Sequence, residues 1–328
     1  MNAKTKITSV AILTSGGDSP GMNCVIRSVV RTAIGNGIKV YGINKGYEGL
    51  LNNDMIEMNA SSVGNIIQRG GTILQSSRCP EFREKHNREK AAQILEDRGI
   101  KALIVIGGDG SFKGAIALNQ EMGVPVIGIP GTIDNDISGT QYTIGFDTAV
   151  QTAIEAVDKI RDTAASSNRT FFIEVMGAKS SSIALKVGIC TGAENVLLSD
   201  QKVDHQKIAD AIRRGIRRGK GSSIIIVAEG DKPGRSYDIA HILKDLHDIS
   251  SKVCVLGHIQ RGGSPTSNDR FLGSVMGQMA IETLMEGNTQ NAIVVRDDRV
   301  QSVPLSDCSE KSDHAMKAFK GIAEELSI

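Results

Sequence analysis

Short apolar runs alternate with amphipathic stretches along almost the whole chain. Apolar residues recur every three or four positions at about 22–37, 88–99, 146–163, 205–220 and 237–250, which predicts helices there. The runs between them predict buried strands, namely SVAILTS (9–15), KVYGI (39–43), ALIVIGG (102–108), VPVIGIP (124–130), RTFFIEVMG (169–177), ENVLLS (194–199), SSIIIVAEG (222–230) and KVCVLGH (252–258). Continuous apolar strands separated by helices are typical of parallel sheets covered on both faces. We therefore expect an α/β protein of two Rossmann-like lobes with mostly parallel sheets, a boundary near 140–150, and a chain that crosses back near 259.

Composition excludes several classes of function. The 328 residues are 40% hydrophobic and 23% charged, which is ordinary globular composition and enough for two domains. A net charge of +1, with 3% aromatic residues and no Trp, argues against a nucleic-acid partner. No segment approaches the ~18 apolar residues of a membrane span, and the N-terminus does not resemble a signal peptide. Five cysteines without a CxxC pair predict reduced, mostly packing thiols in a cytoplasmic protein.

Turns that follow the predicted strands carry the candidate chemistry, because ligands of such sheets bind beyond the carboxyl ends of the strands. The first turn is SGGDSPGMN (15–23), whose backbone N–H groups and following helix suit phosphate, although a tight turn explains it equally well. The second is GGDGS (107–111). Its glycines leave room around Asp109 for an anion and a metal ion, and the alternative is an Asp or Ser that caps a helix.

The third turn is IPGTIDNDISGT (129–140), which places two carboxylates directly after a buried strand. Thr132 can donate to a phosphate, Asp134 can accept a proton from an attacking hydroxyl, and Asp136 can hold a cation or orient its neighbour. Ordinary turn chemistry is the alternative.

The fourth turn is GHIQRGGSP (257–265), where His258 and Arg261 are spaced to reach one anionic group, although a lone His is more often structural. Arg78 in a Gly/Ser-rich loop, Arg169 before a strand and Glu229 after one together suit a phosphorylated sugar. Taken singly, each could be a solvated surface charge.

These motifs together identify a family. The chain resembles the bacterial ATP-dependent 6-phosphofructokinases in the stretches LTSGGDSPGMN, GYEGL, RGGTILQSSRCPEFR, VIGGDGS, PGTIDNDI, YTIGFDTA, RDTAASSNR, EVMG and VLGHIQRGGSP. They occur in the family's order from residue 13 to 265. GGDG alone is weak, because other kinases share it, whereas PGTIDND with GHIQRGGSP is specific.

The resemblance implies an ATP-binding larger lobe (1–145 with about 260–310) and a smaller lobe for fructose 6-phosphate (146–259 with about 311–328). It implies a Mg²⁺ ion on Asp109, catalysis by Asp134 as general base with Thr132, Asp136 and Arg78, and a homotetramer. The implied ATP site consists of Gly17, Tyr47 near the adenine, Arg78, Cys79, Gly108, Asp109, Gly110 and Ser111. The implied sugar site consists of Thr132, Ile133, Asp134, Arg169, Met176, Gly177, Ala178, Glu229, Lys252, His258, Ile259, Gln260 and Arg261, with Arg169 and Lys252 supplied by a neighbouring subunit.

The donor can also be inferred from the resemblance. Family members that use pyrophosphate usually carry Asp and Lys where this chain has Gly110 and Gly131. Small residues there leave space for the rest of ATP, so we expect ATP as co-substrate.

Several positions depart from the family pattern. Ala178 stands where the family has an Arg that helps to neutralise the phosphoryl charge, and Lys252 replaces a second Arg. Among the effector residues, Arg27, Arg31, Arg161, Glu194 and Lys220 match, whereas Ala60, Gly221 and Ser222 replace basic residues. Regulation by ADP or phosphoenolpyruvate is therefore expected to be weak or absent.

Two alternatives to an active kinase follow from these departures. The first is a catalytically weakened regulatory or sensor paralogue with the same fold. The second is a kinase with another acceptor, such as NAD or a different sugar phosphate, against which GHIQRGGSP, Glu229 and Arg169 argue.

Overall fold

The computed structural model describes residues 7–312 and 319–326, and the chain forms two compact α/β units. Unit 1 contains the chain up to Ile133, Ile137–Asp147 and Arg261–Lys311. Unit 2 contains Asp134–Asp136, Thr148–Gln260 and the segment that begins at Ser312. Each unit has its own sheet with helices on both faces, so the predicted α/β class with mostly parallel sheets is confirmed.

Unit 1 is built on a seven-stranded sheet with the order β11-β10-β5-β4-β1-β2-β3. The outermost strands β3 and β11 run antiparallel to their neighbours, and the other pairs are parallel. The strands are β1 (Ser9–Ser15), β2 (Lys39–Ile43), β3 (Met55–Met58), β4 (Ala102–Gly107), β5 (Val126–Pro130), β10 (Gln290–Arg296) and β11 (Arg299–Pro304).

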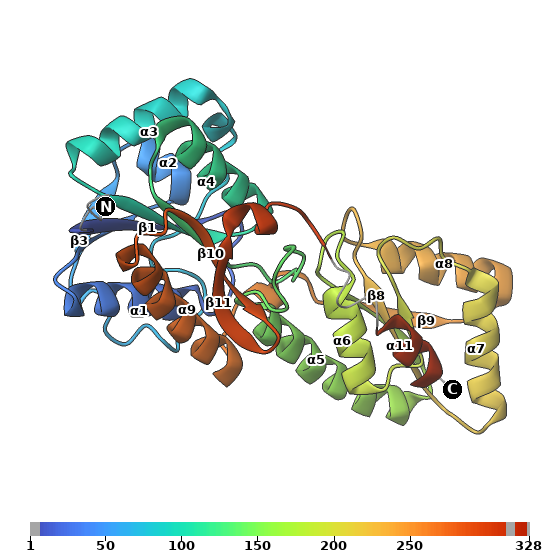
Figure 1. Ribbon diagram of the computed structural model, residues 1–328. Helices are drawn as coiled ribbons and strands as arrows, with labels where there is room; N and C mark the ends of the chain where they lie inside the picture. The colour runs from blue at the N-terminus through green and yellow to red at the C-terminus, as the bar shows by residue number, and fades with distance from the viewer. Residues whose placement is uncertain (1–6, 313–318, 327–328) are drawn as a thin grey trace. The chain divides into compact units, whose positions relative to one another are not determined.

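Helices cover both faces of this sheet (Figure 1). The helices α1 (Met22–Gly35) and α9 (Ser267–Met285) pack on one face, with the apolar side of α1 buried against β1 and β4. The helices α2 (Gly46–Leu51), α3 (Lys85–Asp97) and α4 (Asp109–Met122) cover the other face. The two helices α1 and α9 approach closely at Gly277, where an added Cβ would lie 2.6 Å from Cβ of Ser28.

Unit 2 is built on a four-stranded parallel sheet with the order β7-β8-β6-β9. Its strands are β6 (Thr170–Val175), β7 (Asn195–Leu197), β8 (Ser223–Ala228) and β9 (Ser251–Val255). Apolar residues of α7 and α8 pack with the sheet, and α6 packs with α11. The helices are α5 (Phe146–Ser167), α6 (Ser182–Thr191), α7 (His205–Arg217), α8 (Arg235–His247) and α11 (Lys320–Leu326).

A buried carboxylate fixes the start of α8. Glu174 on β6 is 1% exposed. Its Oε1 accepts a hydrogen bond from the N–H of Gly234 (2.7 Å), and its Oε2 accepts from the N–H (2.8 Å) and the Oγ–H (2.6 Å) of Ser236. A negative charge at a helix N-terminus is favourable. Glu174 therefore joins β6 to α8 at the carboxyl end of the sheet.

Three strands are absent from the sequence prediction: β3, β10 and β11. The strands β10 and β11 form a hairpin in which Arg296 pairs with Arg299 across the two-residue turn Asp297–Asp298. Both turn residues have positive φ, 51° and 56°. This is the geometry of tight hairpin turns that Gly and Asn usually signal.

The expectation that the cysteines are mostly packing residues is wrong for one of them. All five are free thiols, and Cys24 and Cys308 are buried. Cys190, however, lies exposed on α6, so its place in an apolar stretch of sequence did not indicate burial. None of the helices in the described part of the chain is both long enough and apolar enough to span a membrane.

Candidate active site

The first three predicted turns meet at one edge of the unit 1 sheet. Ser15, Gly107 and Pro130 end the adjacent strands β1, β4 and β5 in register. Ser111 donates a hydrogen bond from Oγ to the Ser15 carbonyl (3.3 Å), and the N–H of Gly131 donates to the Gly107 carbonyl (3.0 Å). An added Cβ at Gly107 would lie 2.5 Å from Oγ of Ser111, so glycine is required for this close approach.

The loop that carries Arg78 and Cys79 lies beside the first turn. The N–H of Gly16 donates to the carbonyl of Ser77 (3.2 Å), and Oγ of Ser76 donates to the carbonyl of Gly16 (3.0 Å). Arg78 itself is exposed and Cys79 is half-buried. The structure thus brings Ser76 and Ser77, which directly precede Arg78, next to Gly16.

Tyr47 supports the second turn from behind. Its ring stacks on Phe82 with centroids 3.9 Å apart, and its hydroxyl donates to the carbonyl of Ser111 (2.7 Å). Burial raises the pKa of the Tyr47 phenol, so it remains a hydrogen-bond donor. Only 4% of Tyr47 is exposed, so its part in the site is to hold the Ser111 backbone.

Asp109 is the first residue of α4 and is paired with two lysines that the sequence reasoning missed. Its Oδ2 lies 3.4 Å from Nζ of Lys113, and its Oδ1 lies 3.8 Å from Nζ of Lys311. Lys113 follows Asp109 by four residues in the same helix, a spacing that signals such a pair, whereas nothing in the sequence indicates Lys311.

The donor set at Asp109 can be compared with the needs of Mg²⁺. Within the described residues, no group of three or more His, Cys, Asp or Glu side chains could hold a metal ion. A single half-exposed carboxylate fits Mg²⁺ in the mode in which phosphate oxygens and water supply the other ligands.

The third turn combines buried and accessible residues. Its backbone is fixed by hydrogen bonds from the N–H of Thr132 to the carbonyl of Ile144 (3.1 Å) and from Oγ1 of Thr143 to the carbonyl of Thr132 (2.6 Å). Ile133 is fully buried and Asp136 is 7% exposed, whereas Thr132 and Asp134 are half-buried. Thr132 and Asp134 are thus the members of this turn that remain accessible to a ligand.

Predicted sugar-site residues gather at the carboxyl end of the unit 2 sheet. Oε1 of Glu229 accepts a hydrogen bond from the N–H of Ala178 (2.9 Å), and the N–H of Glu229 donates to the carbonyl of Val175 (3.1 Å). Gly177 and Ala178 both have positive φ, 140° and 48°. The turn after EVMG is therefore a left-handed one that Glu229 holds in place.

Gln260 has a supporting position. It is 0% exposed, its Oε1 accepts from the N–H of Met176 (2.8 Å) and its Nε2 donates to the carbonyl of Ala149 (3.3 Å). A side chain in this position orients the Met176 backbone. His258 and Ile259 in the preceding residues are exposed.

Arg261 belongs to unit 1, whereas Glu229 and Met176, with which it was predicted, belong to unit 2. Its Nη1 donates to the carbonyl of Asp18 (3.1 Å), and an added Cβ at Gly17 would lie 2.6 Å from the same nitrogen. The structure therefore joins the fourth turn to the first turn.

Arg169 and Lys252 lie at the opposite end of the unit 2 sheet from Glu229. Arg169 directly precedes β6, and Lys252 pairs with Phe171 at the start of β9. The length of β6, roughly 17–20 Å at ~3.3 Å per residue, separates them from Met176. One chain does not bring these two cations to the Ala178 turn.

The predicted effector residues of unit 2 have internal partners. Glu194 accepts from Nζ of Lys220 (3.1 Å) and from the N–H of Ile224, and Nη2 of Arg161 donates to the carbonyl of Thr191 (2.6 Å). Arg27 and Arg31 lie four residues apart on α1 of unit 1, where Arg27 is half-buried and Arg31 is exposed.

Comparison with known proteins identifies the family of this chain. Residues 9–284 match the family model described as "Phosphofructokinase". The chain is 50% identical over 321 residues to the ATP-dependent 6-phosphofructokinase of Staphylococcus carnosus, covering 97% of this chain and 99% of the relative. The chain belongs to the phosphofructokinase family.

Solved structures of the family share the fold. Phosphofructokinase from Saccharomyces cerevisiae superposes with a TM-score of 0.85 at 35% identity, covering 98% of this chain and 47% of the longer yeast chain. A pyrophosphate-dependent phosphofructokinase from Marinobacter aquaeolei has a TM-score of 0.82 at 22% identity, covering 93% and 85% of the two chains. The latter likeness concerns the fold alone.

Proposed function

We propose that this chain is an ATP-dependent 6-phosphofructokinase. It transfers the γ-phosphoryl group of ATP to the 1-hydroxyl of D-fructose 6-phosphate and forms fructose 1,6-bisphosphate, the committed step of glycolysis in the cytoplasm. The observation that carries the proposal is the 50% identity, along almost the full length of both chains, to a curated enzyme of that name.

ATP is assigned to unit 1, at the edge where the loops after β1, β4 and β5 meet. Added side chains at Gly108 and Gly110 would have no atom within 4 Å, so the backbone there is open to phosphate. Bound Mg²⁺ would be held at Asp109 and would neutralise phosphate charge. The ATP-binding set that we propose is Gly17, Tyr47 (through the Ser111 backbone), Arg78, Cys79, Gly108, Asp109, Gly110 and Ser111.

Asp134 is assigned as general base. It accepts the proton of the 1-hydroxyl as that oxygen bonds to the γ-phosphorus and ADP leaves. Thr132 is half-buried in the same loop and donates to the transferring group, while Arg78 adds positive charge. The side chain of Asp136 is buried and would support the loop.

Fructose 6-phosphate is assigned to the carboxyl end of the unit 2 sheet. Glu229 and the Met176–Ala178 backbone would bind its hydroxyls, with His258 and Arg261 for its phosphate. Ile133 and Gln260 are fully buried and would support these residues without touching the sugar.

We also propose that Arg169 and Lys252 serve the site of a neighbouring subunit in a homotetramer. Their position at the amino end of the unit 2 strands supports this, since they cannot reach their own chain's Ala178 turn. ADP or phosphoenolpyruvate would act at Arg27, Arg31, Arg161, Glu194 and Lys220. Internal partners of Arg161, Glu194 and Lys220 support weak regulation.

The alternative is a catalytically weakened regulatory or sensor paralogue, which the Ala at position 178 favours. A coupled assay for fructose 1,6-bisphosphate, with fructose 6-phosphate and Mg²⁺, decides between them when run in parallel with ATP and with pyrophosphate. Turnover with ATP alone is expected. Turnover with pyrophosphate would contradict the donor assignment, and folded protein that binds the sugar phosphate without turnover would favour the paralogue.

A further inference from the structure

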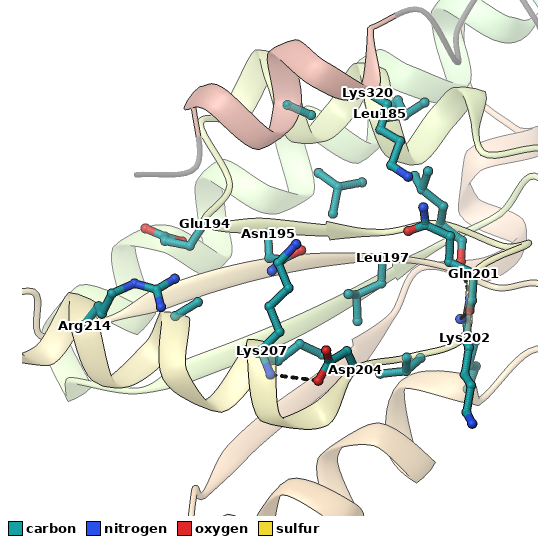
Figure 2. A pocket seen from close by; sticks show the side chains of 17 residues that line it. Leu185, Glu194, Asn195, Leu197, Gln201, Lys202, Asp204, Lys207, Arg214 and Lys320 are labelled. Atoms are coloured by element: carbon teal, nitrogen blue, oxygen red, sulfur yellow. Dashed lines mark hydrogen bonds between the residues drawn. The ribbon is translucent and has the colours of Figure 1, made fainter.

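A cavity of about 480 Å³ lies along the free edge of β7 in unit 2 (Figure 2). It is lined by residues of α6, β7, α7, α8 and α11 and of the loop that follows β7. Within the described residues strand β7 pairs with β8 alone, so the backbone on its other side is not part of the sheet ladder there. The volume falls within the range of about 300–1,000 Å³ typical of small-molecule sites.

Cationic side chains predominate around this cavity. The cavity is lined by five cationic side chains, those of Lys202, Lys207, Arg214, Arg235 and Lys320, and by two carboxylates, those of Glu194 and Asp204. The positive charges therefore exceed the negative charges by three. Figure 2 shows Lys207 extending from α7 across the strand toward Asn195, with Lys320 entering from α11. Lys207 and Arg214 of α7 and Lys320 of α11 thus line one cavity from two helices.

Three of these charged groups already form hydrogen bonds or ion pairs within the fold. Glu194 binds Lys220 and the N–H of Ile224, and Asp204 accepts a hydrogen bond from the N–H of Lys207 (2.9 Å). Arg235 donates from Nη1 to the carbonyl of Leu198 (2.7 Å) and from Nη2 to that of Gln201 (2.8 Å). Both acids and this arginine therefore have structural partners.

The other four cations differ from Arg235 in this respect. Among residues 7–312 and 319–326, no hydrogen bond or ion pair satisfies the charged ends of Lys202, Lys207, Arg214 and Lys320. Unpaired like charges around one cavity repel one another, and an anion in that cavity removes the repulsion. Arg and Lys together are the side chains that hold phosphate groups.

We propose that this cavity is a binding site for a small polyanion that carries phosphate groups. The anion joins Lys207 and Arg214 of α7 to Lys320 of α11, and so ties α11 to the edge of the sheet. The site is distinct from the predicted effector residues. Glu194 is the one residue the two have in common, while Arg161 and Lys220 do not line the cavity.

Site-resolved lysine labelling tests the proposal on the intact protein. Pyridoxal 5′-phosphate is a phosphorylated aldehyde that condenses with a lysine amine with loss of water, and borohydride then fixes the product for peptide mapping. We expect Lys207 and Lys320 to be labelled before the exposed lysines Lys159 and Lys232 of the same unit. Tripolyphosphate, at constant ionic strength, should protect the first pair and leave the second pair unchanged.

A variant provides the second readout. Arg214→Gln removes one cavity cation, leaves both lysines in place and lies at an exposed position where folding is not at stake. It should raise the tripolyphosphate concentration for half-protection by about tenfold, while the matched control Arg218→Gln should not change it. Three results would overturn the proposal. They are equal labelling of all four lysines, labelling confined to Lys220, and a tripolyphosphate concentration for half-protection that Arg214→Gln leaves unchanged. Neither readout uses catalysis, so failure of the proposed kinase activity would not affect the result.

Discussion

Glu229 and Ala178 are joined by a hydrogen bond, with Oε1 of the carboxylate 2.9 Å from the backbone nitrogen. Ala178 has φ of 48°, a left-handed conformation that costs an L-residue about 1–2 kcal/mol. The bond to Glu229 offsets part of that cost and fixes the turn at the carboxyl end of β6. The position of this turn therefore depends on a side chain that lies 51 residues further along the chain.

Two substitutions distinguish the support that Glu229 gives to the Ala178 turn from its proposed role in binding fructose 6-phosphate. Glu229→Gln keeps an acceptor for the N–H of Ala178, so its free energy of unfolding should stay near that of the wild type. Glu229→Ala should lose about 1 kcal/mol in a denaturant titration. Both should raise the KM for fructose 6-phosphate. Equal loss of stability in the two variants would show that the charge, and not the acceptor, holds the turn.

Replacing Ala178 by Arg restores the side chain of the family. The left-handed strain is similar for any L-residue with a Cβ, so stability should change little. We expect kcat to rise by roughly tenfold. This is less than the factor of about 10²–10³ in kcat that one preorganised hydrogen-bond donor typically contributes. Ala178→Lys, which adds charge without the fork of donors, should give a smaller increase. No gain in steady-state turnover with Arg would mean that another residue already supplies this charge.

Removal of the proposed base should separate catalysis from binding. Asp134→Ala is expected to lower kcat by about 10²–10⁴ while the Kd for fructose 6-phosphate, measured by calorimetry, stays close to the wild-type value. Asp134→Asn is the matched control for shape, because it cannot take up the proton and should be equally slow. Normal turnover by either variant would remove Asp134 from the mechanism.

The two glycines that favour ATP differ in their surroundings. An added Cβ at Gly110 meets nothing within 4 Å, whereas one at Gly131 would lie 2.8 Å from Cγ2 of Ile106 and 3.1 Å from Cε of Met22. Gly110→Asp should therefore fold normally and raise the KM for ATP, because a carboxylate there repels phosphate. Gly131→Ala should instead destabilise the fold by about 1–3 kcal/mol. An unchanged KM for ATP in Gly110→Asp would contradict the donor argument.

Because two cysteine thiols are buried, we expect the protein to lose stability at high pH. Burial raises the pKa of Cys24 and of Cys308 to about 11, from 9.0. Between pH 9 and 11 the unfolded chain loses these protons while the native chain keeps them, so the free energy of unfolding should fall as pH rises. Guanidinium titrations at pH 8 and pH 10.5 measure the fall, which should be smaller in the variant Cys24→Ala/Cys308→Ala. An equal fall in that variant would assign the effect to other groups.

Local pattern and motif order determined much of this protein. The apolar runs predicted at 9–15, 102–108 and 222–230 contain the strands β1, β4 and β8, because a run apolar on both faces must be buried between helices. The order of motifs such as PGTIDND and GHIQRGGSP also identified the family, which the comparisons confirm. The strands β10 and β11 were missed because their turn, Asp297–Asp298, lacks the usual glycine.

Only the tertiary structure decided which residues act together. Gln260 and Ile133 lie in matching motifs, yet both are fully buried, because a motif records a position in the chain and not the direction of a side chain. Lys311 reaches Asp109 from about 200 residues further along the chain, a pairing that no local pattern encodes. Arg169 and Glu229 occupy opposite ends of the unit 2 sheet because parallel strands place all their amino ends at one edge. Contacts between distant segments arise from packing, so the sequence supplied the groups and the fold decided their neighbours.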